Sequence, residues 1–433
     1  MRALSDIRGL PPHGTPLGRV RIVGGGLTGI LAAFEAHRLG WRDITIHERF
    51  EALGGGARPK VLHGAEMRGG RLYFGGPGDP VVDALSAHGP RFETFHNRFG
   101  SMSIGADGKR VFTWDFDGPA IDCPAGKVAR PADTSLAARL SAYPPRIAAT
   151  LETYVRWHLD ADPALVHGDA AIPLAIDRVF PAAADLVALA EAKAADPWAD
   201  ELYAVPPGLS GRAADLVASL PVGGFAKLFD DLHRALTRLG VKIELNGLVP
   251  PRQLMAEQHS DEIIVWAADP TPLFAPLGLS APPLVKKCFF TYVYEVEAFD
   301  GPRPVYVQNF TAQGAAFRAY LYESGGKTLV AAECVREADL KTLPTELRIL
   351  LSGFGALKLG PLVHTDAQPR GVYPSLAAID GLSALRARLA ERFGGRFIPG
   401  AWEPHARSAK LAEVNAALAA AREPASALMA RAG

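Results

Sequence analysis

The feature that most constrains this chain is a glycine-rich turn between a short apolar strand and a helix. Residues 19–23 (RVRIV) predict the strand, and the turn Gly24-x-Gly26-x-x-Gly29 follows it directly. Apolar side chains then recur at helical spacing over residues 30–39, and residues 44–47 (ITIH) predict a second strand. A strand, a helix and a second strand in so short a segment predict a βαβ unit with parallel strands.

The spacing of the three glycines is typical of a turn that binds a dinucleotide. The first glycine permits the tight bend, the second lets a pyrophosphate approach the backbone, and the third lets the helix pack on the strand. Glu48 follows the second strand, about 20 residues after the turn, where a carboxylate accepts hydrogen bonds from an adenosine ribose. The alternative is an ordinary tight turn followed by a surface glutamate. These residues alone leave a nicotinamide and a flavin dinucleotide equally open.

Composition excludes several other classes of protein. The 433 residues carry 46 Lys and Arg against 46 Asp and Glu, so no excess of positive charge indicates nucleic-acid binding. No apolar stretch reaches the roughly 18 residues of a membrane span, and the first residues lack the apolar core of a secretory signal. The histidines form no H-x-x-x-H pair, so no metal site is expected. We therefore expect a cytoplasmic protein with a small-molecule substrate, which could form a homodimer.

Periodicity along the rest of the chain predicts one helical region and a second sheet. Residues 131–212 are rich in Ala and Leu at helical spacing, most clearly over residues 183–195, and predict a helical insertion. Further helices are predicted at 223–239, 382–393 and 409–422, and further strands at 241–245, 263–267, 286–298, 317–323, 328–334 and 396–398. The strands between residues 286 and 334 have no helical pattern between them, which predicts an antiparallel sheet separate from the parallel one.

A second glycine run, in residues 51–58 (EALGGGAR), favours a flavin over a nicotinamide. Consecutive glycines directly after the ribose acid let a second loop pass close to the pyrophosphate. Here the sequence resembles the flavin-dependent amine oxidase superfamily, which includes protoporphyrinogen-oxidase-like enzymes and UDP-galactopyranose mutases. The resemblance continues through weaker motifs in the family's order: residues 70–74, 220–225, 246–249, 265–268 and Gly400.

The resemblance implies FAD as the cofactor and a role for each matching residue. Gly24, Gly26, Thr28 and Gly29 would hold the pyrophosphate, Glu48 and Arg49 the adenosine, and Val249 and Ala268 the adenine. Gly55, Gly56 and Arg58 would line the ribityl and pyrophosphate side, and Gly400, Lys410 and Leu411 would face the ribityl chain and flavin O2.

Two departures from the family pattern affect these expectations. The run 400–407 (GAWEPHAR) lacks the Arg or Asp that commonly adjoins the C-terminal glycine, so flavin binding there would rest on backbone groups. The mutases also place two histidines around the stretch where this chain has Leu72 and Gly75, which disfavours the mutase interpretation.

The resemblance also implies a fold with two discontinuous domains. We expect an α/β architecture in which a Rossmann-type FAD-binding domain carries a substrate domain of antiparallel sheet and helical insertion. The FAD-binding domain would contain residues 18–75, 213–285 and 365–433, and the substrate domain residues 76–212 and 286–364.

Lys287 is the candidate catalytic residue. It opens the run KCFFTY in a position similar to that of the amine oxidase lysine, which holds a water against flavin N5. The alternative, with Lys286 beside it, is a solvated lysine at the start of a strand.

Candidate substrate residues are aromatic or charged, and each has a structural alternative. The tyrosines could surround a substrate or belong to the core. The charged pair could bind a substrate or form a salt bridge between strands. The tryptophan could cover the flavin or pack against the protein core. These residues are Tyr73, Tyr320, Tyr322 and Tyr373, the pair Arg318 and Glu333, and Trp402.

The predicted function is an FAD-dependent oxidoreductase of the amine oxidase type, which oxidises a small substrate by hydride transfer to flavin N5. One alternative is a redox-neutral flavin-dependent nucleotide-sugar mutase or isomerase, in which Arg178 and Arg318 are the candidates to bind a pyrophosphate. The other is a flavin-binding protein without catalytic activity.

Overall fold

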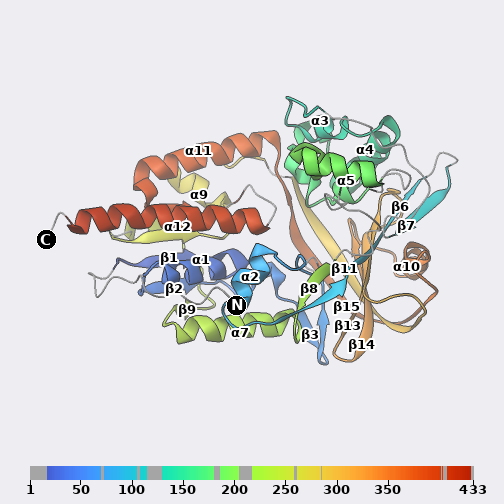
Figure 1. The fold of residues 1–433 in the computed structure, drawn as a ribbon, viewed down its shortest axis with the longest axis horizontal. Helices are drawn as coiled ribbons and strands as arrows, with labels where there is room; N and C mark the ends of the chain where they lie inside the picture. Colours follow the sequence, from blue (N-terminus) through green and yellow to red (C-terminus); the bar gives the residue numbers. More distant parts are fainter. Residues whose placement is uncertain are drawn as a thin grey trace.

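The computed structural model describes residues 17–69, 73–104, 108–114, 129–179, 186–203, 217–257, 261–283, 285–400, 402 and 407–430. The largest sheets in this part of the chain are one of five parallel strands and one of seven strands. Figure 1 shows the parallel sheet with its helices on one side of the molecule and the seven-stranded sheet on the other, with α3, α4 and α5 above it. The predicted combination of a parallel α/β unit with a separate second sheet is confirmed.

The parallel sheet has the strand order β16-β10-β1-β2-β9. These strands are β1 (Val20–Val23), β2 (Ile44–His47), β9 (Lys242–Glu244), β10 (Ile263–Trp266) and β16 (Phe397–Pro399). Every pairing between them is parallel, which confirms the βαβ unit predicted from the glycine turn. The central strands β1 and β10 are buried almost throughout, because helices cover both faces of the sheet.

Each face of the parallel sheet packs against its own set of helices. On one face the core includes α1 (Leu27–Arg38), α7 (Gly224–Arg238) and α12 (Arg407–Ala430). On the other face it includes α8 (Pro251–Glu257), α9 (Thr271–Phe274) and α11 (Leu376–Phe393). Among the residues that the structure describes, none of the helices has both the length and the apolar character needed to cross a membrane.

The seven-stranded sheet has the order β15-β11-β14-β13-β12-β6-β7. Its strands are β6 (Arg98–Ile104), β7 (Arg110–Trp114), β11 (Val285–Phe299), β12 (Val305–Asn309), β13 (Ala316–Ser324), β14 (Lys327–Cys334) and β15 (Leu357–Tyr373). The three strands predicted from the sequence, β11, β13 and β14, pair antiparallel as expected, whereas β6 and β12, which were not among the predicted strands, run parallel to each other. These two strands lie far apart in the sequence, so no tight turn forces them to run in opposite directions.

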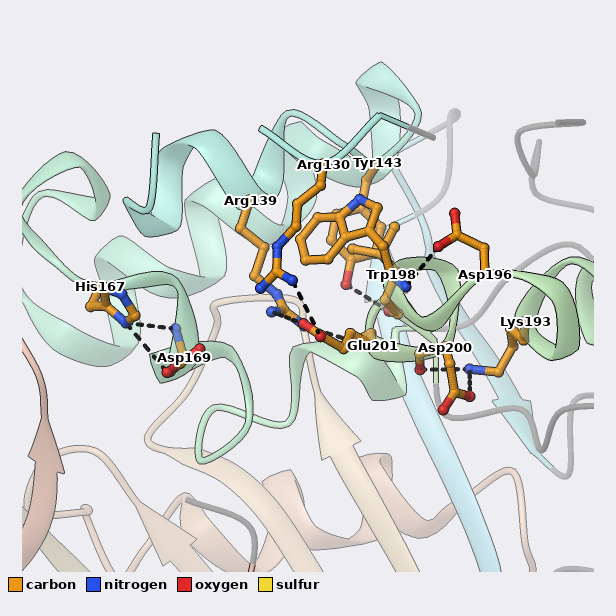
Figure 2. A network of polar contacts seen from close by, with 11 residues as sticks. Arg130, Arg139, Tyr143, His167, Asp169, Lys193, Asp196, Trp198, Asp200 and Glu201 are labelled. Atoms are coloured by element: carbon orange, nitrogen blue, oxygen red, sulfur yellow. Dashed lines mark hydrogen bonds and ion pairs between the residues drawn. The ribbon is translucent and has the colours of Figure 1, made fainter. Parts of the chain in front are cut away.

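The helical insertion lies over one face of this sheet, and α10 (Leu343–Leu351) packs on the opposite face. The insertion contains α3 (Leu136–Leu140), α4 (Pro145–Leu159), α5 (Leu186–Ala195) and α6 (Pro197–Leu202). Figure 2 shows polar contacts between side chains and backbone groups within this insertion. The Arg139 guanidinium lies 5.1 Å from the Trp198 ring and forms an ion pair with Glu201, and the buried Lys193 ammonium lies 2.9 Å from an Asp200 carboxylate oxygen. These contacts join the helices α3, α5 and α6 of the insertion to one another.

The described residues also form two small antiparallel sheets of two strands each. One is a hairpin that pairs β3 (Lys60–Leu62) with β4 (Ala65–Met67), and the other pairs β5 (Phe92–His96) with the distant strand β8 (Val217–Pro221). The helix α2 (Pro80–Ser86) contributes Val81, Val82 and Leu85 to the core of the parallel sheet. The strand β15 continues to Tyr373, across the expected boundary at residue 365. We therefore propose keeping the two discontinuous units, with α2 assigned to the first and the last boundary moved to Tyr373.

Candidate functional site

The glycine turn after β1 combines two crowded positions with one open position. At Gly24, where φ is +105°, an added Cβ atom would lie 3.0 Å from the Ala268 backbone nitrogen. At Gly29 it would lie 1.9 Å from the Gly24 carbonyl oxygen, so only glycine lets the helix approach the turn. At Gly26 an added Cβ would meet nothing within 4 Å. The first and third glycines thus serve the packing of the turn, and the second faces open space.

Two helix N-termini meet at the edge of the sheet where this turn lies. β1 and β16 both run parallel to β10, and α1 and α12 follow their carboxyl ends. Gly26 caps α1 without a side-chain hydrogen bond, and neither α1 nor α12 has an acidic residue in its first turn. Free N–H groups and the partial positive charge of each helix terminus therefore favour an anion at this edge.

A cleft of about 520 Å³ lies between the two helix N-termini. The predicted cofactor residues that line it are Gly26, Thr28, Gly56, Lys410 and Leu411. The structure thus brings together residues from both ends of the chain. Arg407, the first residue of α12, lines the same cleft and was not anticipated from the sequence.

Arg407 gives this cleft a fixed positive charge. Its Nη1 donates a hydrogen bond to the Tyr73 carbonyl oxygen at 3.2 Å, and its guanidinium lies 5.1 Å from the centre of the Phe74 ring. Burial lowers the pKa of the guanidinium, although the charge of Asp79 opposes the shift. A cationic side chain seven positions beyond Gly400 therefore adds to the backbone groups expected in this corner.

Glu48 is buried at the end of β2 and binds the backbone of the glycine turn. One carboxylate oxygen accepts a hydrogen bond from the Gly25 N–H at 2.7 Å, and the other accepts one from the Phe50 N–H at 3.0 Å. An ionised carboxylate has about four acceptor positions, so it can accept further bonds from ribose hydroxyls. The backbone N–H of Gly247 bonds to the Glu48 carbonyl oxygen, which brings the segment before Val249 to the same place.

A second cleft, of about 640 Å³, runs from the glycine loop to the seven-stranded sheet. Among the predicted residues it is lined by Arg49, Gly55, Gly56 and Arg58. Arg58 is held by an ion pair with Asp230 of α7 at 2.9 Å. Thr291 of β11 and Asp366 of β15 lie on its far side. Gly56 lines both clefts, so the two adjoin at the glycine loop.

Gly400 and Trp402 have structural roles in the described part of the chain. A Cβ atom at Gly400 would lie 2.4 Å from the Trp266 carbonyl oxygen, so glycine lets the end of β16 approach β10. Trp402 packs against the core beneath α11, which Val249 and Ala268 also border, and the Arg386 guanidinium lies 5.9 Å from its ring. This arrangement fits the packing interpretation of Trp402.

Lys287 lies on β11 opposite Gly371 of β15 and lines neither cleft. Its charge helps to lower the pKa of His158, a fully buried histidine of α4 that the sequence did not single out. His158 Nε2 lies 2.9 Å from the Tyr373 hydroxyl, and burial is the main cause that lowers its pKa to about 3. Lys287 therefore faces the insertion side of the sheet, and its catalytic role stays a prediction.

The remaining candidate substrate residues are mostly engaged within the protein. Tyr320 stacks on Tyr322 with ring centres 5.2 Å apart, and both are buried. Arg318 of β13 forms an ion pair with Glu333 of β14, the cross-strand salt bridge foreseen as the alternative. Tyr73 is also engaged, because its hydroxyl accepts a hydrogen bond from Arg178 Nη2 at 2.8 Å. No cluster of metal-ligating side chains is found among the described residues.

Comparisons with known proteins identify the fold. Neither a family model nor a curated protein matches the sequence. Reduced UDP-galactopyranose mutase superimposes with a TM-score of 0.63 at 12% identity, over 93% of this chain and 94% of that chain. The chain has the fold of the flavin-dependent amine oxidase superfamily. Cyclohexylamine oxidase from Brevibacterium oxydans IH-35A matches with a TM-score of 0.54 at 13% identity, over 94% of this chain and 99% of that chain. The family resemblance found in the sequence motifs is thus confirmed at the level of the fold.

Proposed function

We propose that the chain is an FAD-dependent enzyme whose cofactor extends along the path formed by the two clefts. The observation that carries this proposal is the convergence of an open glycine, two helix N-termini and two cationic side chains on one cleft. Gly26, Arg407 and Lys410 all line that cleft. Such an arrangement suits a pyrophosphate, because backbone N–H groups and nearby cations both favour bound anions.

The residues at each end of the path fit the other parts of the cofactor. Glu48 would accept the ribose hydroxyls, with Arg49, Val249 and Ala268 around the adenosine. Gly55, Gly56 and Arg58 would line the opposite side, and Leu411 would face the ribityl chain. An added Cβ atom at Gly56 would meet no atom within 4 Å, so this loop leaves room for a ligand.

The reaction that we propose is oxidation of a small substrate. Bound FAD would supply the acceptor for a hydride, at flavin N5. The helical insertion, which packs on the sheet face that carries Lys287, would exclude water there, and the Lys287 ammonium would hold a water molecule or move a proton. Lys287 neighbours a buried aromatic cluster that includes Phe289 and Phe317, which suits an apolar substrate region.

A redox-neutral mutase or isomerase is the second candidate. Two observations favour it: the higher TM-score with UDP-galactopyranose mutase, and the guanidinium of Arg178 beside Tyr73. Such an enzyme would require reduced flavin but would return it unchanged after each turnover.

The decisive experiment is an absorbance spectrum of the purified protein, followed by anaerobic reduction and exposure to oxygen. We expect the two absorbance bands of oxidised flavin and about one FAD per chain after heat release. Fast reoxidation would support an oxidase, and slow reoxidation a dehydrogenase or a mutase. A protein that neither retains FAD nor binds added FAD would contradict the proposal.

A further inference from the structure

We propose that Glu66 and Arg68 are positioning residues, which fix the seven-stranded sheet against the helices that form the cofactor cleft. Glu66 lies on β4 and Arg68 follows this strand directly, and both side chains are buried. They form an ion pair, with Arg68 Nε 3.0 Å from Glu66 Oε2. The effect of the pair on FAD affinity rests on the proposed function, whereas its attachment of α7 to the sheet is independent of any flavin.

The carboxylate of Glu66 caps the helix α7 from a distant part of the chain. Its Oε1 atom accepts a hydrogen bond from the Ala226 N–H, in the first turn of α7, at 2.7 Å. The helix has no acidic residue in its own first turn, and its N-cap Gly223 offers no side-chain hydrogen bond. An added Cβ atom at Gly224, where φ is +91°, would lie 2.5 Å from Glu66 Oε1, so glycine leaves the space that this carboxylate fills. A charge on β4 therefore stabilises the N-terminus of α7.

The same short segment is bound to β13 of the seven-stranded sheet. The Tyr322 hydroxyl donates a hydrogen bond to the Glu66 carbonyl oxygen at 2.8 Å and accepts one from the Arg68 N–H at 3.0 Å. Ser324 Oγ accepts a hydrogen bond from the Glu66 N–H at 2.9 Å. Glu66 thus binds α7 through its side chain and β13 through its backbone, which joins the two parts of the fold at one residue.

Arg68 belongs to a row of cations and aromatic rings that reaches the cofactor cleft. Its guanidinium lies 5.5 Å from the centre of the Phe225 ring of α7 and 5.0 Å from that of Tyr322. Phe225 stacks on Phe74 with ring centres 5.6 Å apart, and the Arg407 guanidinium lies 5.1 Å from the centre of the Phe74 ring. This row therefore connects β13 to the cationic side chain that lines the cofactor cleft.

The second cleft depends on the same segment of chain. Met67 and Gly69, the neighbours of Arg68, line this cleft together with Thr291 of β11. An added Cβ atom at Gly69 would lie 3.0 Å from Thr291 Oγ1, so this segment approaches the sheet closely. Glu66 and Arg68 line neither of the two clefts described above. They would therefore act on a ligand only through the residues that they hold in place.

A stabilising role and a positioning role can be separated because the pair is buried. Removal of one partner leaves a buried charge without compensation, whereas replacement of both by apolar residues of similar size does not. The double variant Glu66→Leu with Arg68→Met should therefore recover much of the unfolding free energy that either single variant loses. It should not recover the cap on α7 or the row of rings, so any function that depends on position stays impaired.

The test compares the unmodified protein, the two single variants and the double variant by hydrogen exchange, urea unfolding and titration of the apoprotein with FAD. In all three variants we expect amide exchange to accelerate by about tenfold both in residues 225–228 of α7 and in residues 322–324 of β13, because one contact set protects both. FAD affinity should fall by about tenfold in the single variants and stay low in the double variant. Ser375→Ala, which removes the side-chain cap of α11, is the matched control and should accelerate exchange in α11 alone.

Milder variants keep the test decisive if the single variants do not fold. Glu66→Gln keeps an acceptor for α7 without the charge, and Arg68→Lys keeps the charge without the planar guanidinium, so each should show a smaller change in the same direction. Faster exchange in only one of the two segments would overturn the inference, as would an FAD affinity that recovers together with stability in the double variant. An unmodified protein that binds no FAD would contradict the proposed function, and the exchange data alone would then decide whether the pair joins α7 to the sheet.

Discussion

At the scale of single residues, the glycines of the turn serve two different purposes that look alike in the sequence: close packing of the backbone, and space for a ligand. Gly24 and Gly29 are required by the close contacts of the turn itself. Gly26 has extended backbone, with φ −72° and ψ 179°, and open space where a side chain would extend. The fold therefore has room for a side chain at Gly26, and such a side chain would clash only with a bound ligand.

The first prediction follows from this difference. Gly26→Val should leave the melting temperature nearly unchanged and abolish FAD retention, because the branched side chain would fill the space left for the pyrophosphate. The measurements are a thermal melt of the apoprotein and the flavin absorbance of the purified variant. Gly29→Ala is the contrasting variant and should lower the melting temperature, since its Cβ would lie 1.9 Å from a carbonyl oxygen. A Gly26→Val protein with a full complement of FAD would show that the pyrophosphate lies elsewhere.

At the scale of elements, His158 joins α4 to the seven-stranded sheet. Its imidazole contacts Tyr373 at the end of β15, and the rings of Phe289 and Phe317 surround it. The positive charges of Arg318 and Lys287 add to the effect of burial and keep the imidazole neutral. The helix α4 therefore contacts the sheet through a histidine whose imidazole stays neutral in the folded protein near neutral pH.

This predicts a loss of stability in acid. The pKa of His158 is about 3 in the folded chain against 6.5 when exposed, so between these values the unfolded chain binds the extra proton. The contribution is fully present above pH 6.5 and decreases as the pH falls, by about 1.4 kcal/mol per unit, or roughly 2 kcal/mol at pH 5. Urea unfolding at pH 7.5 and pH 5.0 measures it.

The variant that tests this assignment is His158→Gln, which should have a smaller loss of unfolding free energy between the two pH values than the unmodified protein. His63→Asn, on an exposed turn where φ is +48°, is the control and should retain the full loss. An equal pH dependence in His158→Gln would assign the acid sensitivity to other groups.

At the scale of the whole molecule, the proposed reaction depends on how the two sheets meet. Lys287 is attached to the seven-stranded sheet, whereas the proposed flavin residues belong to loops of the parallel sheet. We predict that Lys287→Met keeps FAD binding but slows the reduction or reoxidation of the flavin by a factor of about 10²–10⁴, the range for a lost proton transfer.

Rapid-mixing measurements of the two half-reactions, with flavin absorbance as the readout, check this prediction. Lys286→Met is the matched control, because Lys286 is the exposed neighbour on the same strand and should not affect either rate. Equal rates in Lys287→Met and the unmodified protein would assign Lys287 to a structural role.

The sequence by itself determined the local elements and the first half of the site. A strand, three spaced glycines, a helix and an acid lie within a short segment, and their conformations depend on local sterics and hydrophobic periodicity. The long strand β11 and the helix α7 were predictable for the same reason. Thr28 and Gly56, named from the motifs, line the same cleft.

Only the tertiary structure decided which distant residues complete that site. Arg407 enters the cleft because β16 pairs with β10 and directs α12 to the N-terminus of α1, and no local pattern encodes that pairing. The parallel pairing of β6 with β12 and the hydrogen bond from Arg178 to the Tyr73 hydroxyl likewise arise from contacts between segments far apart in the chain. Periodicity reports which face of an element is buried, but not which element covers it. Which group lies next to each charged side chain is therefore decided by how the two sheets and the insertion pack together in the tertiary structure.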